Sequence, residues 1–261
     1  MFLASKLSFD NYNNKVITVR IMNKLLISKL REYIFPIYKD LFANNTFEEI
    51  CTFAIQWGKD YPIEKNKGFL FVGKAVNGWV TKDQNVDTLF DEQNQDRVFN
   101  RDDQIKWVEN LSGNTNGYNT RKSAFWRLVK TVAVSHYGHD WYRHIAWTNL
   151  YKVAPWEGGN PSESLKHKQQ KHCIELLKTE IDIMAPEFVI MLTSGWEEPF
   201  IEELKKGKQY NYITERKWGK YKSILIVIDG VKYIISQHPQ GKVEGEHMAA
   251  INDLIEYGRT L

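Results

Sequence analysis

The sequence predicts an α/β fold with three layers, α/β/α, around a central, mainly parallel sheet of about four strands. Short apolar runs that end at a glycine or a turn residue alternate with segments of helical periodicity, as expected for strands joined by helical crossovers. The clearest strands are the runs 68–73, 144–149 and 187–193 and the run that begins at Tyr233. Because parallel strands bring their carboxyl ends to one edge of a sheet, residues at those ends are expected to share a site.

The segments between the strands carry helix signals. Before the first strand, apolar spacing indicates one helix over 22–42, interrupted by Pro36, and a second helix over 46–58. The strongest helix signal begins at Ser162, a favoured N-cap residue, and stops at Pro186. The remaining predicted elements are a helix from 120, helices over 197–205 and 246–257, and a hairpin around 229–230.

The chain is predicted to form one domain over 22–261, preceded by a flexible N-terminal arm over 1–21. Its 261 residues suit one large α/β domain, and an apolar content of 43% supplies a sizeable core. Residues 80–120 are rich in Asn, Gln and Asp. We expect them to form a polar excursion over the site, with a weak helix around 102–111.

Composition excludes several functional classes. With only Cys51 and Cys173, the chain has neither a disulfide framework nor a four-cysteine zinc or iron–sulfur site, and a reducing, cytoplasmic location is expected. No run of about 18 apolar residues occurs, so no membrane association is predicted. The net charge of +3 does not by itself indicate nucleic-acid binding, but it is compatible with a local basic groove. We predict a monomer without a metal or a cofactor.

Four segments combine turn residues with polar or functional side chains where an apolar run stops. They are Val72-Gly73-Lys74-Ala75-Val76-Asn77-Gly78, Thr148-Asn149-Leu-Tyr-Lys152-Val-Ala-Pro155, Ile183-Met-Ala-Pro186-Glu-Phe-Val-Ile-Met-Leu192, and Gln237-His238-Pro239. In kind and order these segments resemble the landmarks of the uracil-DNA glycosylase superfamily. Those landmarks are a Gly-rich water-positioning motif, an Asn before a Lys-x-x-Pro-like segment, a proline between a helix and an apolar strand, and a final His-Pro. The resemblance covers about residues 68–255 and is that of a divergent member.

The resemblance implies a uracil-DNA glycosylase-like fold and an enzyme that hydrolyses the N-glycosidic bond of uracil or a related damaged base in DNA. His238 would donate a hydrogen bond to a carbonyl oxygen of the leaving base, and Asn77 would hold the attacking water. Asn149 would bind the edge of the base, because its amide offers one acceptor and two donors. The rest of the base site would be formed by Gly73, Trp79 and Phe90.

The DNA backbone, single- or double-stranded, is expected to run past the same strand ends. The residues expected to contact it are Lys74, Lys152, Gln240 and Lys242. The first motif departs from the family, because Ala75 stands where the most active members carry Asp, and Lys74 where several branches carry Gln or Glu. A lysine there could repel a positively charged transition state or contact a phosphate. An alternative is therefore a non-catalytic nucleic-acid-binding protein that keeps the glycosylase fold.

Each candidate residue also has a structural interpretation. Asn77 lies in a sequence typical of turns, Asn149 could cap a turn, His238 could be a structural histidine, and Trp79 could belong to the core. The pattern His136-x-x-His139, together with His144, suggests a metal site, but no carboxylate or cysteine completes a ligand set, so no metal is predicted. An unrelated flavodoxin-like nucleotide-binding module is a third interpretation. It is disfavoured because no Gly-rich phosphate loop follows any strand.

Overall fold

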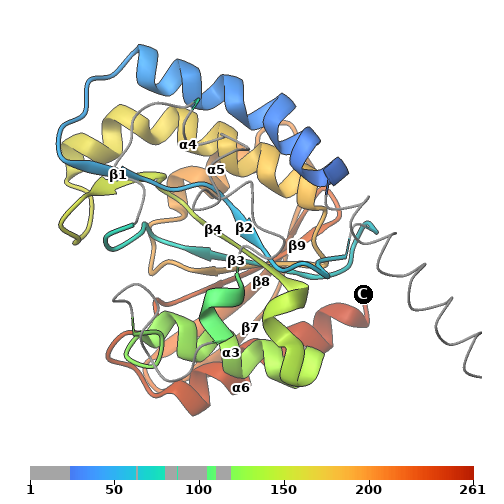
Figure 1. Cartoon of the computed structure of the whole chain (residues 1–261). Helices are drawn as coiled ribbons and strands as arrows, with labels where there is room; N and C mark the ends of the chain where they lie inside the picture. Colours follow the sequence, from blue (N-terminus) through green and yellow to red (C-terminus); the bar gives the residue numbers. More distant parts are fainter. Residues whose placement is uncertain (1–23, 63, 80–86, 88–104, 110–118) are drawn as a thin grey trace, which may run out of the picture.

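The computed structural model describes residues 24–62, 64–79, 87, 105–109 and 119–261. The predicted arm over 1–21 and most of the predicted polar excursion, including Phe90, lie outside the described residues. The described chain is a mixed α/β protein in which helices lie on both faces of one seven-stranded sheet (Figure 1). One face carries the helix of residues 24–43 together with α4 (Glu163–Met184) and α5 (Glu198–Lys205), and the other carries α3 (Ala124–Tyr137) and α6 (Glu244–Arg259).

The strand order of the sheet is β2-β4-β3-β6-β9-β8-β7. The four inner strands pair in parallel: β4 (Ile145–Asn149), β3 (Phe69–Gly73), β6 (Phe188–Leu192) and β9 (Val231–Ser236). Three strands add antiparallel pairs at the two sides: β2 (Gln56–Trp57), β8 (Tyr221–Ile228) and β7 (Tyr210–Trp218). The prediction of about four mainly parallel strands therefore underestimated the sheet, which is larger and mixed.

Two predictions for the N-terminal part were wrong. Residues 24–43 form one uninterrupted helix through Pro36. Burial of its apolar face, including Leu30 and Ile34, offsets the cost of an internal proline. The predicted helix over 46–58 is replaced by β1 (Ile50–Thr52) and β2, and β1 pairs with β5 (Val153–Pro155) in a separate two-stranded ribbon. A continuously buried apolar stretch satisfies helical and strand periodicity equally well, so the pattern could not separate them.

Most later elements agree with their sequence signals. The hydroxyl of Ser162 accepts a hydrogen bond from the backbone N–H of Leu165 at the start of α4, which confirms the predicted N-cap. The β8–β9 hairpin turns at Asp229 and Gly230, whose φ angles of 51° and 82° fit a type I′ turn. Strand β7 was not predicted, because its mostly exposed or half-buried residues show no clear alternation.

The inner strands divide their side chains between two cores. In β3, Leu70 and Val72 join the core beneath α4, whereas Phe69 and Phe71 join the core beneath α3 and α6. Because both faces of these strands are covered, polar groups can emerge only where the strands end. In the part of the chain that the structure describes, no helix has the length and apolarity needed to cross a membrane.

Candidate functional site

The candidate site lies at the carboxyl edge of the parallel strands. Gly73 ends β3 and is the register neighbour of Asn149, which ends β4. A Cβ at Gly73 would lie 2.4 Å from Oδ1 of Asn149, so only glycine allows the amide to lie across this strand end. The ring of Phe125, on α3, lies beside the same point, and it is nearly parallel to the ring of His238, with 6.4 Å between the ring centroids. The structure therefore brings Gly73, Asn149 and His238 together around Phe125.

Phe125 is a site residue that sequence reasoning missed. It is one of the buried apolar residues of α3. Nothing in the sequence distinguishes it from the other apolar residues of α3. Its position beside the candidate site follows from the first turn of α3, which is capped by the hydroxyl of Ser123 and starts next to the ends of β3 and β9.

Asn149 presents an unsatisfied donor. Its side chain is 2% exposed, and Nδ2 forms no hydrogen bond with the described residues. A buried amide nitrogen without an acceptor is costly, and native structures keep few of them. An acceptor such as a ligand carbonyl would remove that cost.

The backbone of Asn149 is held from below by Lys152. The ammonium group of Lys152 donates to the carbonyl oxygen of Asn149 at 2.8 Å, to the hydroxyl of Thr148 at 2.5 Å and to the carboxylate of Glu180 at 2.7 Å. Both side chains of the Lys152–Glu180 ion pair are fully buried. Burial raises the pKa of Glu180, and the charge of Lys152 opposes that rise.

The prediction that Lys152 contacts the DNA backbone is therefore wrong. Lysines that follow a strand are usually solvated, but here the chain turns back into β5 and carries this lysine under the strand end. Its charge is compensated by Glu180 of α4 rather than by a phosphate. The role that the geometry gives Lys152 is to fix the turn that carries Asn149.

His238 is held through its backbone and one ring nitrogen. Its backbone N–H donates to the hydroxyl of Ser194 at 2.7 Å, and its Nδ1 accepts from the backbone N–H of Gln240 at 3.4 Å. Burial, followed by the charges of Lys74 and Lys242, lowers the pKa of His238 to about 4. The imidazole is therefore neutral at pH 7, and with Nδ1 accepting, its proton is assigned to Nε2. His238 is thus a neutral hydrogen-bond donor.

A buried polar network supports the end of β9, two residues before His238. His247, on α6, stacks on Trp218 with 4.0 Å between the ring centroids, and its Nε2 lies 2.7 Å from the hydroxyl of Ser236. That hydroxyl lies 2.6 Å from the hydroxyl of Ser223. Burial lowers the pKa of His247 to about 3. Sequence reasoning missed this network, because no motif links its members.

Lysines lie near His238. Lys74 and Lys166 both lie over the ring of Trp196, with the ammonium groups 5.0 Å and 4.2 Å from its centroid. Burial and then the charge of Lys242 lower the pKa of Lys74, which indicates that these cations lie near one another. Gln240 is exposed, and its carbonyl oxygen accepts from Lys242. The predicted backbone-contact residues Lys74, Gln240 and Lys242 thus share this edge with Lys166, which was not predicted.

Two other predicted residues have structural contacts. Asn77 is exposed, and its amide oxygen accepts a hydrogen bond from the backbone N–H of Gly159 at 2.5 Å, which ties together the loops after β3 and β5. That oxygen has a second lone pair, so water binding by Asn77 stays a prediction. Trp79 packs edge-to-face against Phe53 and Trp147. This packing fits the core interpretation of Trp79 better than base stacking.

The described residues contain no group of three His, Cys, Asp or Glu side chains that could hold a metal ion. Of the histidines that suggested one, His136 contacts Asn252 and Arg259 instead, and His144 stacks on Tyr137. Comparison with protein-family models gives no match, and comparison with curated protein sequences finds no significant similarity. The resemblance to the glycosylase superfamily therefore rests on the residues of this chain.

Proposed function

We propose that this protein is a DNA glycosylase-like enzyme, a divergent relative of the uracil-DNA glycosylases with their three-layer fold. It hydrolyses the N-glycosidic bond of uracil or a related damaged base in DNA. The observation that carries the proposal is the meeting of a buried amide, Asn149, and a neutral imidazole, His238, around Phe125 at one edge of the parallel strands. The block of four parallel strands with helices on both faces supports the proposed fold.

His238 stabilises the leaving base. When the bond between C1′ of the sugar and the ring nitrogen breaks, its electron pair stays with the base and negative charge spreads to a carbonyl oxygen. The Nε2–H of His238 donates to that oxygen. Because the pKa of His238 is about 4, the group donates a hydrogen bond and remains neutral. One such donor in a partly dry site contributes about 100- to 1000-fold to a rate.

Asn149 selects the base. A pyrimidine edge with an N–H and a carbonyl matches an amide that offers both an acceptor and donors. The unpartnered Nδ2 of Asn149 gains its hydrogen bond when the correct base enters. A base without that carbonyl leaves the donor buried and unpaired, which gives discrimination. Phe125 supplies an aromatic ring next to the same space, where a base can stack.

Water completes the reaction at C1′, where its oxygen forms the new bond and its proton is released. Asn77 is proposed to hold this water through the free lone pair of its amide oxygen. With Ala75 in place of an acidic residue, catalysis depends on stabilisation of the leaving base, so a slow enzyme is expected. Lys74, Lys166 and Lys242, which lie near one another, are proposed to contact phosphates of the strand.

The test is an excision assay. The protein, in excess, is incubated with oligonucleotides that carry one uracil in single- or double-stranded form, and abasic sites are then cleaved with alkali. Strand scission at the uracil, with none in a matched thymine oligonucleotide, is the expected result. If neither the single- nor the double-stranded substrate is cleaved, the proposed glycosylase activity is refuted.

A non-catalytic nucleic-acid-binding protein is the second candidate. It is favoured by Ala75 and Lys74 in the first motif and by the bond that already engages Asn77 with Gly159. This candidate predicts DNA binding without scission, with an affinity that falls as salt rises, because phosphate contacts release counterions. Binding that does not respond to salt would count against both candidates.

A further inference from the structure

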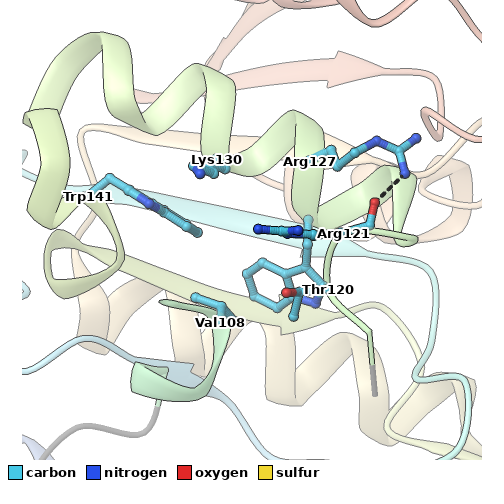
Figure 2. Close-up of a pocket in the computed structure, with 7 residues that line it drawn as sticks. Val108, Thr120, Arg121, Arg127, Lys130 and Trp141 are labelled. Carbon is cyan, nitrogen blue, oxygen red and sulfur yellow. Dashed lines mark hydrogen bonds between the residues drawn. The ribbon is translucent and has the colours of Figure 1, made fainter. Parts of the chain in front are cut away.

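A concave region lies beside α3, separate from the residues used above. It is a cavity of about 270 Å³ lined from four segments: Val108 in η2 (Lys106–Glu109), Thr120 and Arg121 before α3, Lys130 on α3, and Trp141 after it. This size is near the lower end of small-molecule sites, so it suits a small ligand. Figure 2 shows Trp141 entering from one side and Arg121 from the opposite side, with Lys130 above and Val108 below.

The walls of this Arg121 pocket are aromatic. Trp126 and Trp141 both line it, and both are almost fully buried, so their positions are fixed by the core. Trp126 packs edge-to-face against Trp107 and Trp147 on its other side. Rigid indole rings beside a cavity favour flat ligands, and stacking on such rings accepts any nucleobase.

The rim of the Arg121 pocket is cationic. Arg121, Arg127 and Lys130 line it, and no carboxylate of the described residues does. Arg127 is engaged, because it pairs with Glu244 and donates to the carbonyl oxygen of Arg121. Among the described residues, no carboxylate pairs with the side chain of Arg121 or Lys130. Two uncompensated cations beside two indoles favour a ligand with a flat ring and an anionic group.

The Arg121 pocket is next to the candidate base site. Trp126 follows Phe125 in α3, and their ring centroids are 5.4 Å apart, while that of Phe125 is 6.4 Å from His238. Neighbouring nucleotides of one strand can span such a separation. An extended single strand whose base lies at His238 would therefore pass the pocket.

We propose that the Arg121 pocket binds a nucleotide, with its base beside Trp126 and Trp141 and its phosphate at Arg121 and Lys130. The ligand chemistry is that of a nucleotide, free or within a strand. Its assignment as the nucleotide that flanks the excised base in a single strand rests on the proposed function. The nucleotide site itself does not.

Calorimetric titration of the full chain tests this proposal without excision. Thymidine monophosphate is expected to bind at least about tenfold more tightly than thymidine, because Arg121 and Lys130 hold its phosphate. A variant with both Arg121→Gln and Lys130→Gln should lose about tenfold or more of that affinity. Both side chains are at least partly solvent-accessible, so the variant is expected to fold. Lys122→Gln removes an exposed charge that does not line the pocket and is the matched control.

A uracil-free single-stranded oligonucleotide distinguishes the two sources. If the double variant has a lower affinity for the oligonucleotide and an unchanged affinity for thymidine monophosphate, the site holds a nucleotide within a strand. If it has a lower affinity for thymidine monophosphate and an unchanged affinity for the oligonucleotide, the site holds a free nucleotide. If neither ligand binds, or if Lys122→Gln weakens both as much as the double variant, the nucleotide site is refuted. If the protein excises uracil but binds neither ligand at the Arg121 pocket, only the nucleotide site is refuted. If it binds them but excises no uracil, only the proposed glycosylase activity is refuted.

Discussion

The two polar residues of the candidate site are held in opposite ways. The Asn149 side is fixed from the interior, by the fully buried Lys152–Glu180 pair below and by close contact with Gly73 beside it. His238 lies in a loop after β9, where hydroxyl and backbone contacts hold it, and burial, followed by the charges of two partly exposed lysines, lowers its pKa. The comparison teaches that Asn149 is fixed by fully buried contacts, whereas the charge of His238 also depends on partly exposed lysines. Substitutions should separate these two kinds of control.

Lys152→Met should cause the largest effect, on stability. It leaves the carboxylate of Glu180 buried without its cation, which costs about 3–5 kcal/mol of unfolding free energy. The double variant Lys152→Met with Glu180→Leu removes both charges and should recover most of the loss. Urea unfolding measures both variants. A loss below about 1 kcal/mol in the single variant would show that the pair does not hold this side of the site.

His238→Ala should lower uracil excision by about 100-fold or more, because one donor to the leaving base is lost. Stability should change little, since the backbone N–H of His238 keeps its hydrogen bond to Ser194, and the exposed N–H of Gln240, which loses Nδ1 as its acceptor, can bind water. Single-turnover excision rates and urea unfolding give the two readouts. His139→Ala, an exposed histidine in the segment before β4, is the matched control. An unchanged rate would remove His238 from the mechanism.

Gly73→Ala should lower excision by about 10- to 100-fold, because the new Cβ would lie 2.4 Å from Oδ1 of Asn149 and must displace the amide. The fold should survive, since one side chain can move at the edge of the sheet. Gly245→Ala is the control, because a Cβ there meets nothing within 4 Å. If both variants excise at the same rate, the position of the Asn149 amide does not matter for catalysis.

The smallest effect should be a change in the titration of His238. The pKa of about 4 should rise in Lys74→Gln and rise less in Lys242→Gln, because both lysines disfavour the imidazolium and Lys74 does so more. NMR titration of the ring carbons measures this directly. If the pKa of His238 rises in neither variant, the two lysines do not contribute to its lowering.

The same pKa fixes the sign of the pH dependence. The pKa of His238 is about 4 in the folded protein and about 6.5 in the unfolded chain. Its contribution to stability is therefore complete above pH 6.5 and is lost as the pH falls toward 4. Excision should likewise decline near pH 4 rather than near pH 6.5, provided that the protein remains folded.

Sequence patterns predicted the parts of the fold with one clear periodicity. The 22-residue helix α4 carries a cap, a stripe of buried residues and a following proline, so its bounds were clear. Strands β1 and β2 were missed because continuous burial hides the period, and β7 was missed because exposure hides it. Periodicity reveals an element that buries only one face. It is least informative when both faces of a strand are buried or both are exposed.

The ends of the strands predicted where Gly73, Asn149 and His238 would meet, because parallel strands share one carboxyl edge. They did not predict the burial of Lys152, since a lysine after a strand normally reaches solvent. One signal was present. Glu180 lies among the buried residues of α4, near Leu176, Leu177 and Ile181, and a carboxylate in such a stripe requires a cationic partner.

The buried network beneath β9 has a direction. Indole nitrogen only donates, so Trp218 fills a lone pair of Ser223, and among the described residues the only other polar partner of that hydroxyl is Ser236. The hydroxyl of Ser223 therefore donates a hydrogen bond to that of Ser236, and the hydroxyl of Ser236 donates to Nε2 of His247. A proton on Nε2 of His247 would turn this acceptor into a donor, so the hydroxyl of Ser236 would lose the acceptor of its own proton. Acid would thus weaken the contact between α6 and the root of the His238 loop.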